Sequence, residues 1–340
     1  MIDERWDSDV EEIATALRKM LSAESSSELV RRAEAEHDGI SPELQSQIEA
    51  FGLDQLEGSA ALFARVALEL GRAIAPTAFV ETMPVLALAG RPAVSYGFGN
   101  LVPASVPKVA VVSDVVSAER LNGVARKTAA GDVLVAHQTG GEHEQIGGAE
   151  LGDRIERYAL LTNAARLVGA SQALLEYTVG YAKEREQFGR PIWSFQAIRH
   201  RLANVVADID AADLLVRKAA FAADPDNGGD GAPPGHFAIM VWAKAVQAAR
   251  LTATNAHQVF GGNGFAMEYD VQLYSRRMRS WAMRGPRVDG LLSELGRMVL
   301  DPARRDEMRL VWQFERGIQI PRWAREADSQ DVENVSSKPD

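Results

Sequence analysis

The chain has 340 residues, of which 46% are hydrophobic and 25% are charged, and its formal net charge is −10 at pH 7. This acidic balance excludes nucleic acid or an anionic membrane surface as the main partner, because both require a concentrated basic face. The sequence contains no cysteine, which excludes disulfides, thiolate catalysis and cysteine-ligated zinc or iron–sulfur centres.

Residues 1–99 are predicted to form an N-terminal helical domain. The segment DSDVEEIATALRKMLSA has apolar residues at spacings of three and four, with Asp7 or Ser8 as its cap. Ser41 is followed by Pro42, which is typical of an N-cap and a first helical position. We expect the helix in SAALFARVALELGRAIAP to stop at Pro76.

The first twelve residues, MIDERWDSDVEE, lack the basic start and apolar core of a signal peptide. No uninterrupted apolar run approaches the roughly 18 residues that a membrane-spanning helix needs. We therefore expect a cytoplasmic protein with no membrane partner.

Residues 100–152 are predicted to form a small β domain. The runs KVAVVSDVV and DVLVAHQ are β-branched and are separated by turn sequences such as AAGD. The segment is too short for an independent sandwich of about seven strands. His137 and His143 lie in HQTGGEHE, which we interpret as a solvated loop and not as a metal site.

Residues 153–325 return to helical periodicity, and residues 326–340 form a polar tail. One apolar stripe combines Ile198, Leu202, Val205, Ile209, Ala212 and Leu215. The loop DPDNGGDGAPPG ends that helix, the next helix ends at Gly261 and Gly262, and a further helix covers roughly residues 288–300. Long helices joined by short loops favour an antiparallel bundle.

Two stretches of this region resemble the C-terminal helical domain of acyl-CoA dehydrogenases. They are YAKEREQFGRPIWSFQAIRHRLAN, residues 181–204, and HQVFGGNGFAMEYDVQLYSRRMRSW, residues 257–281. Both signatures, their order and the intervening Pro/Gly-rich loop fit that family. The resemblance implies a mainly α fold of the acyl-CoA dehydrogenase type, with an N-terminal helical domain, a shortened middle β domain and a C-terminal antiparallel four-helix bundle.

The resemblance also implies FAD as cofactor, with its pyrophosphate and adenosine lying against the helices of a neighbouring subunit. An arginine fork, an aromatic face, amide groups and exposed glycine backbone all suit such a nucleotide tail. The positions that match the family's contacts are Arg185, Phe188, Gln196, Gln258, Gly261 and Gly262. Each is a common structural device on its own, whereas together, in the family's order, they favour cofactor contacts made in trans.

The family's reaction needs a carboxylate that removes the α-proton of an acyl-CoA thioester. The resemblance implies that the usual position of this base falls at Gly285 and the less common position at Ala159. Neither residue is acidic. Glu156 and Asp289 lie one helical turn from these positions, and either is a candidate for a displaced base, although an exposed helix charge is the simpler role.

The family's Thr-Glu-Pro-type loop and Trp-x-Thr stretch, which seat the flavin ring, have no counterpart in residues 100–153. We therefore expect a heteromer in which a second acyl-CoA dehydrogenase subunit supplies the base and the ring pocket. Such α2β2 members act on steroid-derived acyl-CoA and pass electrons to an electron-transferring flavoprotein. Two alternatives stay open: a self-sufficient homomeric enzyme with a displaced base, and a non-catalytic structural subunit.

The arginines at 276, 277, 279, 284 and 287 are denser than a solvated face needs. They are candidates for contacts with a partner subunit or with coenzyme A phosphates. Ion pairing at the surface is the simpler prediction.

Overall fold

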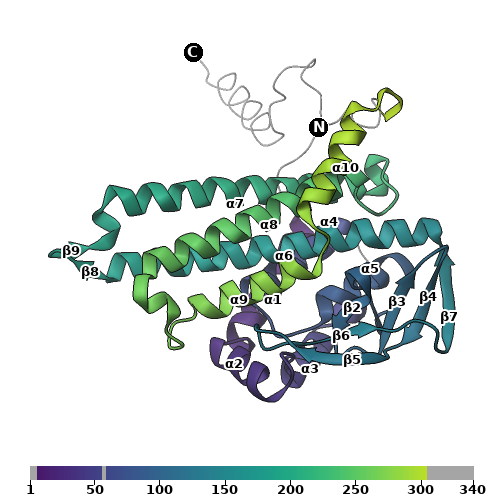
Figure 1. Ribbon diagram of the computed structural model, residues 1–340, viewed down its shortest axis with the longest axis horizontal. Coiled ribbons are helices and arrows are strands. Elements are labelled where there is room, and N and C mark those ends of the chain that lie inside the picture. Colours follow the sequence, from purple (N-terminus) through teal and green to yellow (C-terminus); the bar gives the residue numbers. More distant parts are fainter. Residues whose placement is uncertain (1–5, 56–58, 305–340) are drawn as a thin grey trace, which may run out of the picture.

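The computed structural model describes residues 6–55 and 59–304, and the predicted polar tail of residues 326–340 lies outside them. The protein is mainly helical, with two small sheets beside the helices (Figure 1). The helices are α1 Ser8–Glu24, α2 Ser27–Glu36, α3 Pro42–Ala50, α4 Ala60–Arg72, α5 Phe79–Ala89, α6 Ala149–Glu184, α7 Gln196–Ala223, α8 Gly235–Phe260, α9 Val271–Arg284 and α10 Val288–Leu300.

Most strands lie between α5 and α6, and one short hairpin follows α6. The strands are β1 Val94–Ser95, β2 Leu101–Pro103, β3 Lys108–Val112, β4 Val115–Arg120, β5 Gly123–Lys127, β6 Val133–His137, β7 His143–Gly148, β8 Glu186–Gln187 and β9 Arg190–Pro191. They form sheets of order β1-β3-β4-β7 and β2-β6-β5, and the hairpin β8-β9. Apart from the parallel pair β1–β3, neighbouring strands are antiparallel. The mainly α fold with a small β region confirms the predicted fold class.

The start of α3 confirms its predicted cap. Ser41 Oγ accepts a hydrogen bond from the backbone N–H of Leu44 at 3.2 Å, and Pro42 takes the first helical position. Asp7 precedes α1, but its side chain makes no capping hydrogen bond. The helix α4 ends at Arg72, before the predicted stop at Pro76.

Buried ion pairs join the N-terminal helices. The carboxylate of Glu69 in α4 is almost fully buried, and it accepts hydrogen bonds from Arg18 Nε at 2.8 Å and from Arg65. Arg65 also pairs with Glu11 at 3.1 Å. Because a buried carboxylate is costly without partners, this pairing fixes α1 against α4.

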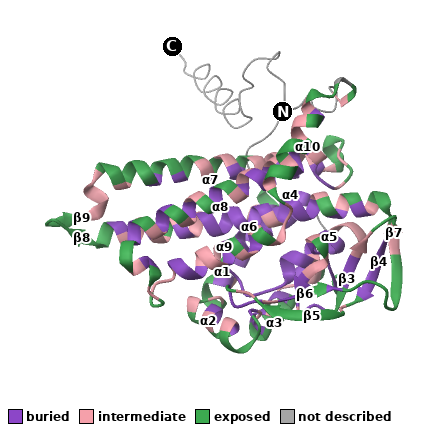
Figure 2. Ribbon diagram, in the orientation of Figure 1, coloured by how far each residue is buried: buried purple, intermediate pink, exposed green. Residues whose placement is uncertain are grey.

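The helix α6 forms the centre of the molecule. Figure 2 shows much of it buried, with α7, α8 and α9 beside it and α4 behind. A Cβ built on Gly169 would lie 1.9 Å from the carbonyl oxygen of Leu68, and one on Gly71 would lie 2.0 Å from that of Arg166. The two glycines therefore permit the close approach of α4 and α6.

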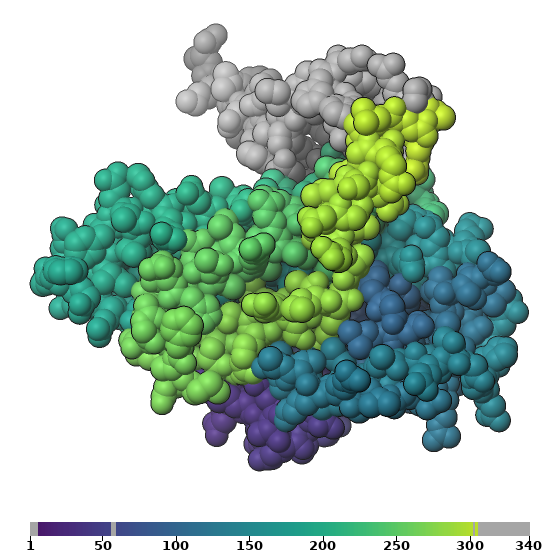
Figure 3. All heavy atoms as spheres, viewed as in Figure 1, coloured from purple at the N-terminus to yellow at the C-terminus, as the bar shows by residue number. Residues whose placement is uncertain are grey.

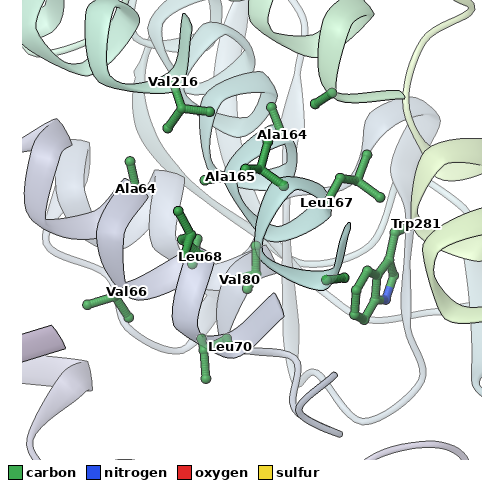
Figure 4. Close-up of a cluster of buried hydrophobic side chains, with 14 of the residues drawn as sticks. Ala64, Val66, Leu68, Leu70, Val80, Ala164, Ala165, Leu167, Val216 and Trp281 are labelled. Carbon is green, nitrogen blue, oxygen red and sulfur yellow. The ribbon is translucent and has the colours of Figure 1, made fainter. Parts of the chain in front are cut away.

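Apolar side chains from distant parts of the chain meet around this crossing (Figure 4). Leu68 of α4, Val80 of α5, Ala165 of α6, Val216 of α7 and Trp281 of α9 all belong to one core cluster. None of the described helices is long and apolar enough to cross a lipid bilayer.

The prediction of a solvated loop at HQTGGEHE is wrong for His137. This residue lies in β6 and is buried, with its Nε2 atom 3.1 Å from Oε2 of Glu119 in β4. The backbone N–H of Asn122 donates to its Nδ1 atom at 3.1 Å. The pair links the two sheets, and the described residues contain no cluster of His, Asp or Glu that suits a metal ion.

Candidate functional site

Gly285, the usual family position of the base, follows directly after α9 and packs against Trp242 of α8. A Cβ built on Gly285 would lie only 2.2 Å from Cζ2 of the Trp242 ring. The backbone at Gly285 is extended, with φ −84° and ψ 176°, so its conformation would accept any residue. The indole is 1% exposed and donates from Nε1 to the carbonyl oxygen of Pro286 at 3.1 Å. The tryptophan therefore fills the space that a side chain at position 285 requires.

Ala159, the less common base position, is buried in α6 within an apolar cluster that includes Tyr96. The Tyr96 ring packs edge-on against Phe98 at 5.3 Å between centroids, and Phe98 packs against Trp242 at 6.3 Å. We call Tyr96, Phe98 and Trp242 the aromatic plug. Its rings run from the apolar cluster around Ala159 to the indole that packs against Gly285.

Glu156 and Asp289, the two candidates for a displaced base, lie outside this plug. Glu156 is exposed, and its Oε1 atom accepts a hydrogen bond from the Tyr96 hydroxyl at 3.0 Å. Burial raises the pKa of Tyr96 above its usual value, and the Glu156 charge raises that pKa further, so the tyrosine stays protonated and donates. Asp289 in α10 is 91% exposed and lies 4.0 Å from Arg287.

A buried carboxylate that sequence reasoning missed, Glu81 of α5, lies next to the plug. Its Oε1 atom accepts hydrogen bonds from Arg166 of α6 at 2.9 Å and from Arg284 of α9 at 3.1 Å. Arg284 also pairs with Asp132, and burial lowers the pKa of Arg284 while Glu81 opposes that shift. Both arginines therefore hold Oε1 of the Glu81 carboxylate, whereas its buried Oε2 atom has no hydrogen-bond partner among the described residues.

The prediction that the arginine cluster forms ion pairs at the surface is therefore wrong for two of its members. The side chains of Arg277 and Arg284 are 5% and 11% exposed. Arg277 pairs with Glu34 of α2 at 3.2 Å, and Arg276 pairs with the same carboxylate at 2.8 Å. These contacts fasten α9 to the N-terminal helices.

The residues predicted to bind the cofactor gather at the opposite end of α8. Trp242 and Gln258 are 16 residues apart on that helix, a separation of about 24 Å along its axis. At this end Ala182 of α6, Leu202 of α7 and Val259 of α8 form a small apolar cluster. Figure 1 shows the hairpin β8-β9, the start of α7 and the end of α8 together there. We call this region the bundle tip.

The β8-β9 hairpin carries two of the predicted contacts. Phe188 lies in its turn with φ 57° and is 92% exposed. Positive φ is unusual for a bulky residue, and here the turn projects the ring into solvent. Arg185 is exposed, and within the described part of the chain its side chain forms no hydrogen bond or ion pair.

The end of α8 supplies an open backbone. Gly261 has φ 58° and ψ −131°, a conformation that L residues avoid. A Cβ built on Gly261 or Gly262 would meet nothing within 4 Å. Gln258 is exposed beside them, and Gln196 begins α7 with its Nε2 atom 3.2 Å from His200 Nε2. The structure thus brings all six predicted residues to the bundle tip.

Two exposed apolar side chains at the bundle tip were missed from the sequence. Phe265 is 80% exposed and Met267 is 65% exposed, both just after α8. Their position directly after GGNG within the second signature was the available signal.

Comparison with known proteins identifies the family of the C-terminal part of the chain. Residues 157–285 match the model described as "Acyl-CoA dehydrogenase, C-terminal domain". This C-terminal part of the chain belongs to the acyl-CoA dehydrogenase family. Members of this family bind FAD. The chain is 38% identical over 148 residues to acyl-CoA dehydrogenase FadE34 of Mycobacterium tuberculosis, an alignment that covers 44% of this chain and spans only 19% of that relative.

Solved structures of acyl-CoA dehydrogenases share the fold. The ChsE4-ChsE5 complex from Mycobacterium tuberculosis superposes with a TM-score of 0.77 at 17% identity, over 88% of this chain and 99% of that chain. The Tcur3481-Tcur3483 steroid ACAD G363A variant superposes with a TM-score of 0.76 at 19% identity, over 87% of this chain and 98% of that chain. The acyl-CoA dehydrogenase fold thus extends over most of the chain.

Proposed function

We propose that this chain is a subunit of a heteromeric, FAD-dependent acyl-CoA dehydrogenase and that a second subunit supplies the catalytic base. The reaction is the α,β-desaturation of an acyl-CoA thioester. The observation that carries the proposal is the packing of Trp242 against Gly285, where a Cβ has no room. A carboxylate at this position would have to displace a buried indole.

The bundle tip supports a second part of the proposal, that this chain completes a flavin site seated mainly in its partner. The Arg185 guanidinium would hold a phosphate or adenine group through its fork of donors. The Phe188 ring offers a face for stacking, and the open backbone at Gly261 and Gly262 permits close approach of a pyrophosphate. A bound flavin would supply the acceptor for the hydride that leaves the substrate β-carbon.

The exposure of these groups fits a contact made in trans. A contact within one chain would cover Phe188, yet this ring is 92% exposed. A stable interface commonly buries such an aromatic anchor near its centre. The adjacent Gln258 and Gln196 would add amide hydrogen bonds from the same surface.

The proposed substrate is a bulky acyl-CoA, with an acyl group of the size of a steroid-derived one. Two observations support this substrate. The small β region would leave more space for an acyl group in a heterodimer than two complete β domains would. The chain also shares its fold with a steroid ACAD. The proposal includes re-oxidation by an electron-transferring flavoprotein, as the family implies. Equal activity on ordinary fatty acyl-CoA would contradict the bulky substrate.

The homomeric alternative requires Glu156 or Asp289 as the base. Glu156 is tied to the Tyr96 hydroxyl, and Asp289 lies in solvent at 91% exposure. The structural-subunit alternative requires that the bundle tip makes no flavin contact.

One experiment separates all three readings: co-expression with a second dehydrogenase subunit, followed by measurement of flavin per chain and turnover. The proposal expects one flavin for every two chains, and flavin loss when this chain carries Arg185→Ala with Gln258→Ala. Full flavin retention in that variant would favour the structural subunit. A yellow, active isolated chain would favour the homomeric enzyme.

A further inference from the structure

A groove of about 590 Å³ runs between α8 and α9, and its lining includes neither the aromatic plug residues nor the six predicted cofactor residues. Its floor is formed by small or apolar side chains, among them Ala249 and Ala253 of α8 and Met278 and Ala282 of α9. The two helices are antiparallel neighbours, and in Figure 3 they form the face toward the viewer in successive greens. Because the alanine side chains are short, the floor lies below the longer side chains on either side, which leaves a channel between the two helices.

The rim of this groove is basic. Arg250 of α8 and Arg279 of α9 line it, and both residues are exposed. Among the described residues neither side chain has a hydrogen-bonding or ion-pairing partner. A third arginine of the lining, Arg276, is engaged with Glu34 at 2.8 Å. No Asp or Glu is among the residues that line the groove, although the chain as a whole carries a charge of −10.

The ends of the groove define its length. At one end His257 Nε2 lies 2.8 Å from Ser275 Oγ, and at the other end lie Val246 and Met283. The twelve residues from 246 to 257 span about 16 Å of helix axis. An apolar-floored channel of this length fits roughly three turns of an amphipathic helix.

The positive charge of the rim decides which kind of helix the groove can bind. A second copy of this chain, docked by a two-fold axis through the groove, would place Arg250 and Arg279 against the same arginines, and such like-charge contacts are costly. A helix with carboxylates beside an apolar ridge would pair with both rims.

We infer that the α8–α9 groove seats a helix of the second dehydrogenase subunit, with small or apolar residues on the floor and carboxylates against Arg250 and Arg279. The inference rests on the proposed function, because that proposal supplies the partner. The groove ends at His257, next to Gln258 of the bundle tip. A helix docked there would therefore bring the partner beside the residues that contact its flavin tail.

The test uses the full chain with the co-expressed second subunit. Arg250→Glu with Arg279→Glu reverses the rim charge, and Ala253→Phe fills the floor without changing charge. We expect each variant to raise the dissociation constant of the heteromer about tenfold or more, and the charge variant to lose much of the wild-type salt dependence. The matched control, Arg126→Glu with Arg297→Glu, makes the same charge change at exposed sites on β5 and α10 and should stay within about twofold.

A dissociation constant that stays at the wild-type value in either groove variant overturns the inference and leaves the proposed function standing. A wild-type chain that forms no heteromer overturns both. Saturable binding of coenzyme A to the isolated chain, lost in the arginine variant while the heteromer persists, would assign the groove to a small anion and also overturn the inference.

Discussion

The substitution Gly285→Ala tests whether the predicted base position is physically filled. Its Cβ would lie 2.2, 2.7 and 2.9 Å from three atoms of the Trp242 ring, far inside the 3.4 Å at which ordinary contact begins. The neighbour is a rigid, buried ring, so it must move as a whole. Overpacking of this kind costs about 1–3 kcal/mol, and losing the Trp242 hydrogen bond to Pro286 adds about 1 kcal/mol.

A double-mutant cycle isolates this clash. Trp242→Ala alone should destabilise the chain by about 3–5 kcal/mol. In that background Gly285→Ala should be nearly neutral, which gives a coupling energy of about 2 kcal/mol between the two sites. The assay is urea unfolding followed by far-UV circular dichroism, because tryptophan fluorescence changes with the substitution itself. Gly290→Ala in α10 is the control, since its Cβ would meet nothing within 4 Å, and it should stabilise by about 0.5–1 kcal/mol.

The reasoning fails if Gly285→Ala unfolds at the same urea concentration as the wild type. It also fails if the two substitutions are additive, because the cost would then come from somewhere other than the indole.

Three further predictions follow from the buried and exposed charges. Arg185→Ala should weaken flavin binding by the complex about 5–30-fold, worth about 1–2 kcal/mol, with no change in the unfolding midpoint; flavin release on dilution measures this, and full retention would contradict it. Glu81→Gln removes the carboxylate that pairs with buried Arg166 and Arg284, and it should cost about 3–5 kcal/mol in urea unfolding; a loss under 1 kcal/mol would contradict the burial argument. Burial would raise the pKa of Glu69, but its hydrogen bonds from Arg18 and Arg65 outweigh that effect and lower the pKa below its ordinary value of 4.5. The ionised Glu69 therefore stabilises the fold above pH 4.5, and this stability is lost as the pH falls through the lowered pKa; Glu69→Gln should flatten the acid limb of the melting-temperature profile, and an unchanged limb would refute it.

Helices of the C-terminal bundle were predictable because their signals are local. The predicted helix at 288–300 has the bounds of α10, and α8 ends at the predicted glycines. Both rest on amphipathic spacing followed by helix-breaking residues. By contrast, α5 was not predicted, since it contains Pro84 and its apolar residues form no single stripe.

Contacts between distant segments were not predictable from local patterns. Arg284 and Glu81 are 203 residues apart, and His137 and Glu119 come from different sheets. An arginine on a polar helix gives no sign of a partner so far away, which is why the cluster was predicted to lie at the surface.

The candidate site also has one part that sequence signatures predicted and one part that they did not. Family signatures placed the six cofactor residues, and the structure places them together at the bundle tip, although their role in flavin binding stays a prediction. The aromatic plug had no such signature. Tyr96, Phe98 and Trp242 come from separate segments, and only the fold brings their rings together.

The most direct test of the proposed function is to replace the candidate carboxylates in one subunit of the reconstituted heteromer at a time and to measure turnover. Replacing the partner's catalytic glutamate by glutamine should lower turnover by about 10²–10⁴-fold, whereas Glu156→Gln with Asp289→Asn in this chain should leave it unchanged. Loss of turnover with the latter pair, or desaturation of an acyl-CoA by this chain alone, would contradict the account.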